Sequence, residues 1–565
     1  MAQLKWWQKA VFYQIYPRSF ADGNGDGIGD FPGMLQKLDY LRELGIDAVW
    51  LSPHFPSPNW DCGYDISDYT AVASEYGTLD DFRAFLDGAH ARQIRVILDL
   101  VLNHTSDQHP WFLESKSSRD NPRADWYVWV DTPPNNWQSV FDGPAWTYVP
   151  ERDQYYYHYF MQQQPDLNWH NPQVRQAMWQ AVRFWLDLGV DGFRLDAIGT
   201  IFEDPQRRNH PLPITMGDLR HLQDNARTAQ EKELVEQYWH DMFQYQQGKP
   251  HRLMKELRRV LDEYDGDRML VGEDEDVSYL GDGRDELNLV YNFALLRLAR
   301  LTPRDLRRNQ AERLAALAQI SPDAWPCNTL GNHDNSRSWN RFGDGLHDAA
   351  LARLHLALVL TLRGTPFLYN GEELGMTDTL LTDISQFRDT MGTWHYHNMV
   401  DELGVDPAEA LRRAAAMTRD KNRTPMQWSA AANAGFCPEG VSPWLPVNPD
   451  FARGVNAAAE EADPGSLLHF VRRLLAVRRA NPALVAGEYH DLIPSAKDKL
   501  VFLRRTPEQS VLVALNFSAE TVRLKLPALE DRRPHLLFSS AMREPRPADG
   551  QLRLEPFEVF IAEAA

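Results

Sequence analysis

Cysteine is scarce in this chain. Only three of its 565 residues are cysteines, and Cys62, Cys327 and Cys437 lie far apart in the sequence. This spacing excludes a disulfide framework and the closely spaced thiols of a zinc or iron–sulfur site. We therefore expect a protein of a reducing compartment, the cytoplasm.

Long hydrophobic runs are missing as well. The N-terminal segment Met-Ala-Gln-Leu-Lys-Trp-Trp-Gln-Lys has neither the apolar core nor the cleavage signature of a signal peptide, so none is predicted. No apolar run approaches the roughly 20 residues that a membrane-spanning helix needs. The hydrophobic fraction of 43% and the charged fraction of 24% are typical of a soluble globular enzyme, and no membrane partner is expected.

Positive charge is in deficit. Lysine and arginine number 59 against 79 aspartate and glutamate residues, which gives a formal net charge of −20. A surface of this sign repels phosphate and argues against nucleic acid or anionic membranes as partners. A neutral small molecule such as a sugar is compatible with it.

Strand-like and helical patterns alternate from Ala10 to about Tyr369. Alternation of this kind indicates parallel strands joined by right-handed crossovers, and eight such units predict an α/β fold, a closed (β/α)₈ barrel of the TIM type. The eight strand candidates are Val11–Tyr16, Ala48–Leu51, Arg95–Leu100, Gly192–Asp196, Met269–Glu273, Leu287–Phe293, Cys327–Gly331 and Thr365–Tyr369.

The alternation divides the chain into four parts. Residues 1–103 and 170–484 are expected to form the barrel, with long loops at 200–267 and 377–464 after the fourth and eighth strands. Residues 104–169 are rich in Trp, Tyr, Asn and Pro and predict a subdomain inserted after the third strand. Residues 485–565 change to short alternating runs, which predict a C-terminal antiparallel β-sandwich domain. Its expected strands are Leu500–Arg504, Ser510–Asn516, Thr521–Leu526 and Leu552–Ile561.

Three acidic residues stand at the ends of three strand candidates. They are Asp196 in Gly-Phe-Arg-Leu-Asp, Glu273 in Leu-Val-Gly-Glu, and Asp334 in Gly-Asn-His-Asp-Asn. The carboxyl ends of barrel strands are where this fold builds active sites, and a nucleophile with a proton donor is what retaining glycoside hydrolysis needs. Arg194 lies two residues before Asp196, so both side chains share one face of the strand. A purely structural Arg–Asp pair accounts for that spacing equally well.

Other polar residues follow the same strand ends. His333 precedes Asp334, and His104 closes the third strand, where each could hydrogen bond a sugar hydroxyl. Tyr64 and Asp65 follow the second strand and place an aromatic face beside a carboxylate, a combination that suits a sugar. Asp99 is expected to be structural.

The segment Asp22-Gly-Asn-Gly-Asp-Gly-Ile-Gly-Asp30 alternates oxygen ligands with glycines. It is similar to the first half of an EF-hand loop and suits Ca²⁺ or Mg²⁺. It lacks the distal glutamate of that motif, and a metal-free turn held by Asp and Asn side chains is the rival interpretation.

These residues together resemble the α-amylase superfamily of glycoside hydrolases, in particular the oligo-1,6-glucosidase and α-glucosidase branch. The resemblance extends from Trp6 to about Trp428 and more loosely through the C-terminal domain. It rests on the strand-end motifs above and on further segments in the same order, among them Ala-Val-Phe-Tyr-Gln-Ile-Tyr-Pro-Arg-Ser-Phe, Gly-Tyr-Asp-Ile-Ser-Asp-Tyr, Asp-Leu-Val-Leu-Asn-His-Thr-Ser, Gln164-Pro-Asp-Leu-Asn168, Gly-Glu-Glu-Leu-Gly-Met and Arg423-Thr-Pro-Met-Gln-Trp428.

The resemblance implies a role for each matching position. Asp196 is expected to be the nucleophile, Glu273 the acid/base and Asp334 the transition-state stabiliser. It implies that His104, Arg194 and His333 bind the sugar, that Tyr64 stacks on it, and that Asp65 with Arg423 closes the subsite and makes the enzyme exo-acting. The structural metal loop would use Asp22, Asn24, Asp26, the Ile28 carbonyl and Asp30, and no organic cofactor is expected.

The expected reaction is hydrolysis of terminal α-linked glucose from short oligosaccharides through a covalent glucosyl-enzyme, by a monomer or small homo-oligomer. Ala197 directly follows the nucleophile, where the resemblance links valine to α-1,6 substrates, so it favours α-1,4 linkages. An oligo-1,6-glucosidase and a transglucosylase or isomerase of the trehalose synthase or sucrose isomerase type remain alternatives. Asn370, in place of a usual glutamine, and the 200–267 loop are expected to lie near the substrate entrance.

Overall fold

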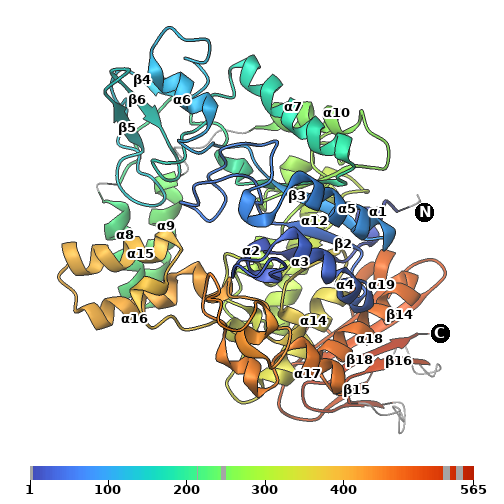
Figure 1. Ribbon diagram of the computed structural model, residues 1–565. Helices are drawn as coiled ribbons and strands as arrows, with labels where there is room; N and C mark the ends of the chain where they lie inside the picture. The colour runs from blue at the N-terminus through green and yellow to red at the C-terminus, as the bar shows by residue number, and fades with distance from the viewer. Residues whose placement is uncertain (1–3, 213, 244–249, 526–534, 542–550, 565) are drawn as a thin grey trace.

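The protein is described by a computed structural model covering residues 4–212, 214–243, 250–525, 535–541 and 551–564 (Figure 1). Within these ranges, no helix combines the length and apolar character needed to cross a membrane.

Eight strands form one parallel sheet in the order β10-β11-β1-β2-β3-β7-β8-β9. Neighbouring strands are parallel, with Phe12 opposite Ala48, Ala48 opposite Arg95, and Gly192 opposite Met269. All eight strand candidates are confirmed, although the sixth and seventh are only two residues long. The strands are β1 Phe12–Ile15, β2 Ala48–Leu51, β3 Arg95–Val101, β7 Gly192–Asp196, β8 Met269–Gly272, β9 Leu289–Val290, β10 Cys327–Asn328 and β11 Thr365–Tyr369.

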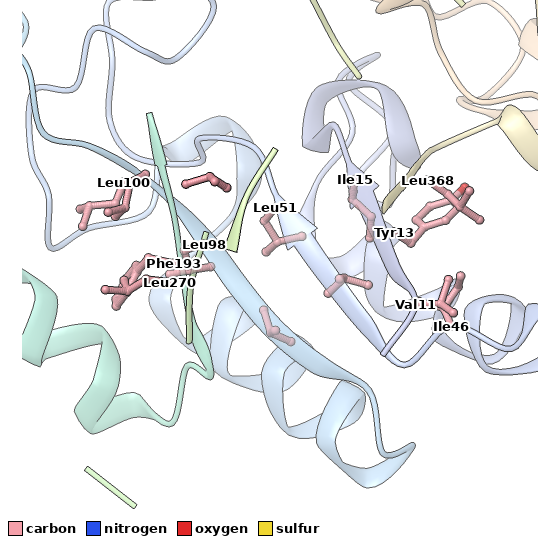
Figure 2. Close-up of a cluster of buried hydrophobic side chains, with 14 of the residues drawn as sticks. Val11, Tyr13, Ile15, Ile46, Leu51, Leu98, Leu100, Phe193, Leu270 and Leu368 are labelled. Atoms are coloured by element: carbon pink, nitrogen blue, oxygen red, sulfur yellow. The ribbon is translucent and has the colours of Figure 1, made fainter. Parts of the chain in front are cut away.

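The sheet curves into a nearly closed barrel, and its side chains alternate between the inside and the outside, since successive residues of a strand face opposite sides. One set points inward and packs into a single cluster that draws on seven strands: Phe12, Ala48, Trp50, Ile97, Met269, Val271, Leu289, Cys327 and Phe367. The alternate set, including Tyr13, Ile15, Leu51, Leu98 and Phe193, faces outward into the main core (Figure 2). Both faces are therefore buried, as expected for a parallel barrel.

Helices cover the outside of the barrel, and their ends carry clear local signals. Thr78 and Asp81 form a capping box at the start of α5, and Gly189 ends α7 in a left-handed conformation. The larger outer helices are α4 Leu38–Leu44, α5 Leu79–Ala91, α7 Pro172–Leu188, α10 His251–Leu261, α12 Pro303–Ile320, α14 Asp348–Thr361 and α18 Leu467–Ala480. Shorter helices are α1 Trp6–Lys9, α2 Pro17–Phe20, α3 Phe31–Gln36, α11 Phe293–Leu296, α13 Ser338–Phe342, α17 Ala457–Ala462 and α19 Pro482–Ala486.

Three insertions extend from the carboxyl ends of the strands. The first follows β3 and contains α6 Pro110–Ser117 and an antiparallel sheet of β4 Trp129–Val130, β6 Gln154–Tyr157 and β5 Trp146–Val149. The second follows β7 with α8 Met216–Asn225 and α9 Ala229–Phe243, and the third follows β11 with α15 Thr390–His397 and α16 Pro407–Met417. In Figure 1 the helices of the second and third insertions lie in one group below the small sheet.

The C-terminal part is antiparallel, as predicted. A five-stranded sheet has the order β12-β13-β14-β18-β16, and β15 pairs with β17. The predicted run Leu552–Ile561 contains two strands, because Phe557 adopts a positive φ of 54° and breaks it; Leu526 of another predicted strand lies outside the described residues. The proposed domain boundaries stay a prediction. These strands are β12 Glu488–Asp491, β13 Lys499–Arg505, β14 Ser510–Asn516, β15 Val522–Lys525, β16 His535–Ser539, β17 Gln551–Leu554 and β18 Val559–Glu563.

Candidate active site

A single guanidinium joins two of the three strand-end acids. Arg194 points into the barrel from β7, and its Nη1 lies 2.6 Å from Asp196 Oδ1 and 2.9 Å from Asp99 Oδ1. Its Nη2 lies 2.9 Å from Glu273 Oε2. Asp196 is the last residue of β7 and Glu273 directly follows β8, so adjacent parallel strands bring these carboxyl groups to one guanidinium.

Burial raises the pKa of both Glu273 and Asp196, but to different values. Burial raises the pKa of Glu273 to about 8 against the opposing charge of Arg194, and the nearby Asp196 and Asp334 add to the rise. Burial also raises the pKa of Asp196, to about 6, with Arg194 again opposing. At pH 7 Glu273 therefore carries a proton while Asp196 is mostly ionised, which is the division of labour expected of a proton donor and a nucleophile.

Asp334 is held ionised by arginines. Its Oδ1 lies 2.7 Å from Arg423 Nη2 and 3.4 Å from Arg419 Nη1. Burial opposes ionisation, but His333 and these arginines bring the pKa of Asp334 well below its usual value. Burial lowers the pKa of His333 well below its own normal value, so the imidazole is neutral at pH 7. We therefore attribute the lowered pKa of Asp334 to the arginines.

The predicted sugar-binding residues lie around this group. The Tyr64 ring stacks on His333 with ring centroids 5.5 Å apart, and the Tyr64 hydroxyl lies 2.8 Å from His333 Nε2. The same hydroxyl donates to Asp99 Oδ2 at 3.0 Å. His104 Nε2 lies 3.0 Å from the Gln164 amide nitrogen, so the QPDLN segment of the first insertion reaches the end of the barrel. Asp99, which holds both Arg194 and Tyr64, is structural, as expected.

The predicted pairing of Asp65 with Arg423 is wrong. The Asp65 carboxylate is fully buried and accepts hydrogen bonds from the backbone N–H groups of Trp60 and Asp61, each at 3.0 Å. It therefore shapes the turn after β2, while Arg423 binds Asp334. The pair that does form near this point is Asp61 with Arg419, at 2.7 Å.

Arg419 connects several groups at this end of the site. Besides Asp61 and Asp334, it binds Asp389 at 2.7 Å, and Asp61 in turn accepts from Gln164 at 3.2 Å. Sequence reasoning missed Asp61 and Arg419, each four residues before the residue chosen in its place. Each segment contains two residues of the same charge four positions apart, Asp61 with Asp65 and Arg419 with Arg423. Only the backbone hydrogen bonds of Asp65 show which aspartate is left to pair with an arginine.

Ala197 and Asn370 have different surroundings. Ala197 adopts a left-handed conformation with φ 41°, and its N–H donates to Glu273 Oε2 at 3.0 Å, so it lies within the site. Asn370 is fully buried and its side-chain oxygen accepts from the Tyr16 N–H at 3.1 Å. The expectation that Asn370 lies near the substrate entrance stays a prediction; its amide holds the backbone of Tyr16 after β1, and the Tyr16 ring stacks on His333 with centroids 5.7 Å apart.

The Asp22–Asp30 loop is held by its own backbone. Asp22 accepts from the N–H groups of Gly25 and Gly27, and Asp30 accepts from Gly23, Asn24 and Gly33. Asn24 and Asp26 accept from backbone N–H groups two residues ahead. In the part of the chain that is described, no three acidic, histidine or cysteine side chains form a group able to hold a metal. The donor types suit a hard cation, but a bound metal remains a prediction. The reaction proposed for Asp196 and Glu273 uses no metal.

Two hollows of about 700 and 1180 Å³ lie at the opposite end of the barrel, near Lys5, Arg95, Asp267 and Arg268. Their lining residues include none of the predicted site residues. Because a parallel barrel gathers its chemistry at the carboxyl ends of its strands, we place the site with Arg194 and the three acids.

Comparison with known proteins agrees with this geometry. The "Alpha amylase, catalytic domain" family matches residues 14–487, and the "Maltogenic Amylase, C-terminal domain" family matches residues 492–561. The chain is 38% identical to the oligo-1,6-glucosidase of Parageobacillus thermoglucosidasius, covering 98% of each, and 40% identical to a probable α-glucosidase of Rhizobium meliloti (strain 1021), covering 99% of this chain and 97% of that protein.

A solved structure is similar over the same length. The trehalulose synthase MutB from Pseudomonas mesoacidophila MX-45 superimposes with a TM-score of 0.87 at 38% identity, covering 99% of this chain and 100% of that one. A mutant of that protein was solved with its substrate sucrose. With its full-length relatives and both matching domains, this chain belongs to the α-amylase family of glycoside hydrolases, in the branch of oligo-1,6-glucosidases and α-glucosidases.

Proposed function

We propose that this protein is a retaining, exo-acting α-glucosidase that releases glucose from short α-glucosides. The observation that carries the proposal is the contact of one guanidinium with two carboxyl groups of different proton affinity, beside a third acid that arginines keep ionised.

In the first step, ionised Asp196 attacks the anomeric carbon while Glu273 donates its proton to the leaving oxygen. The C–O bond to the leaving group breaks and an ester between glucose and Asp196 forms. Arg194 keeps Asp196 charged, and the anionic Asp334 stabilises positive charge that develops on the sugar ring.

In the second step, Glu273, now ionised, takes a proton from water, whose oxygen attacks the anomeric carbon and releases Asp196. Two inversions return the α-anomer. The retaining outcome is supported by the closeness of the two acids: Asp196 and Glu273 lie 2.6 and 2.9 Å from the two terminal nitrogens of the same Arg194 guanidinium. Carboxyl groups with room for a water between them would instead favour inversion.

We attribute exo action to Asp61 and Arg419 in place of the pair expected from the sequence. Arg419 also contacts Asp334, and the pair is held by Asp389, which binds Arg419, and by Gln164, which donates to Asp61. A glucose ring bounded by this pair has no path for a further sugar on its non-reducing side, so only terminal glucose would be cleaved.

A preference for α-1,4 linkages is inferred from Ala197, a small residue that directly follows Asp196 and whose N–H donates to Glu273. Relatives named oligo-1,6-glucosidases make α-1,6 cleavage the nearest alternative. Isomerisation of sucrose is a second candidate, favoured by the full-length similarity to a trehalulose synthase.

The test is a product profile on maltose, isomaltose, sucrose and maltotriose, with the anomer of released glucose followed by NMR. We expect α-glucose from maltose at the highest kcat/KM. Initial release of β-glucose would contradict the retaining mechanism, and isomaltulose or trehalulose from sucrose would identify an isomerase.

A further inference from the structure

Arg220 joins the three insertions that surround the site. It lies on α8 and is only 6% exposed. Its Nη2 donates to the Val140 carbonyl in the first insertion at 2.8 Å. Its guanidinium carbon lies 5.6 Å from the Trp239 ring on α9 and 5.4 Å from the Trp394 ring on α15. One buried cation therefore connects segments that follow β3, β7 and β11.

The Val140 carbonyl, to which Arg220 donates, belongs to a turn beside two phenylalanines, Phe141 and Phe160, which we call the aromatic wall. Phe141 follows Val140, and its ring lies 6.0 Å from the Arg419 guanidinium carbon. Phe160 lies 6.3 Å from Phe141 and 5.1 Å from the His104 ring, between centroids. The two phenylalanines thus stand against Arg419 and His104, two side chains of the glucose subsite assigned above.

Hydrogen bonds within the aromatic wall also hold its two segments together. The Ser139 hydroxyl donates to the Phe160 carbonyl at 2.6 Å and accepts from the Phe141 N–H at 3.0 Å, and the Val140 N–H donates to the Tyr159 carbonyl at 2.9 Å. These bonds make the wall one rigid unit. Arg220 fixes this unit to the helices of the other two insertions, while Trp137, just before the unit, donates to the Arg208 carbonyl of the second insertion at 2.7 Å.

We propose that Arg220 is a positioning residue for glucose: it holds the Val140 turn so that Phe141 stays against Arg419, and it makes the second and third insertions part of the subsite. This inference rests on the proposed function, because it takes the sugar next to Arg419 to be glucose. The described contacts of Arg220 are with Val140, Met417, Trp239 and Trp394, which are not reacting groups, so we take its effect to pass through the wall.

The experiment measures glucose as a competitive inhibitor and, separately, by calorimetry. Replacing Arg220 by Gln removes the charge between the two tryptophans and weakens the hold on Val140, so we expect glucose affinity to fall about tenfold. Arg220→Lys keeps the charge but not the planar fork, and we expect it to recover part of the loss. Arg258→Gln is the matched control, since Arg258 is 5% exposed and binds Asp262 and Asn288 away from the site.

A double-mutant cycle with Phe141→Leu tests the route of the effect. If Arg220 acts through the wall, the double variant binds glucose about as weakly as the weaker single variant, whereas independent effects add. Additive losses, or a glucose affinity unchanged in Arg220→Gln, would overturn the inference. So would an equal loss in Arg258→Gln, which would mark a general response to lost stability. Failure of the wild-type protein to bind glucose would instead contradict the proposed function.

Discussion

At the scale of single residues, the arrangement of charge around Arg194 makes a chemical division of labour possible. Asp196 and Glu273 share one guanidinium, yet burial leaves them with pKa values of about 6 and about 8. Turnover needs Asp196 ionised and Glu273 protonated. We therefore expect kcat/KM to rise with pH through about 6, to peak near pH 7, and to fall through about 8.

The profile of Glu273→Gln identifies the group responsible for the alkaline fall. This variant cannot donate a proton, so we expect kcat/KM to drop about 10²- to 10⁴-fold on a glucoside with a poor leaving group and the alkaline limb to disappear. With α-glucosyl fluoride, whose leaving group needs little protonation, the loss in kcat/KM should be much smaller, whereas kcat should stay low because Glu273 is also the base of the second step. An alkaline limb that survives in Glu273→Gln belongs to another group.

A second prediction at this scale separates Asp61 from Asp65. Replacing Asp61 by Asn removes one partner of Arg419 but leaves Asp389 in place, so we expect kcat/KM to fall at least about tenfold with little change in the melting temperature. Asp65→Asn weakens two backbone hydrogen bonds to a buried carboxylate, so we expect the melting temperature to fall. Kinetics and thermal unfolding of both variants check this, and the reverse pattern would restore the sequence-based pairing.

At the scale of elements, the open question is whether the Asp22–Asp30 loop binds a cation. Asp22, Asp26 and Asp30 place three carboxylates in one turn, where they accept hydrogen bonds from backbone N–H groups. A bound cation would relieve their repulsion. We expect calcium at saturating concentration to raise the melting temperature by about 2 °C or more after treatment with EDTA, and Asp26→Ala to lose this response. The same midpoint with EDTA and with calcium would mean that the Asp and Asn turns suffice.

At the scale of the whole molecule, the C-terminal sheet is joined to the barrel by a buried cation. Arg504 on β13 is fully buried and donates to the carbonyls of Thr361, at the end of α14, and of Gly487. Arg504→Ala leaves these carbonyls unpaired and opens a cavity, so we expect a loss of roughly 2–4 kcal/mol in the free energy of unfolding. Its neighbour Arg505 is exposed on the other face of the strand, and Arg505→Ala should unfold within about 0.5 kcal/mol of the wild type. Equal losses in the two variants would contradict this account.

The barrel could be predicted from the sequence because its signals are local. Ala48–Leu51, Gly192–Asp196 and Thr365–Tyr369 are predicted with the observed bounds, since short apolar runs between helices leave little choice. The strand-end positions of Asp196 and Glu273 follow from the same signals, because parallel strands bring their carboxyl ends to one face, while Asp334 lies in the loop after β10, which ends at Asn328.

The sequence alone therefore determined the fold class and the place of the three acids. Only the tertiary structure decided which neighbours serve them. Asp61 and Asp65 are equally charged and four residues apart, as are Arg419 and Arg423, and nothing local distinguishes them. The choice depends on burial and on hydrogen bonds between segments more than 300 residues apart, such as Asp61 with Arg419. The contact of Arg220 with three insertions is of the same kind, because a residue's partners in space are set by packing and not by its sequence neighbours.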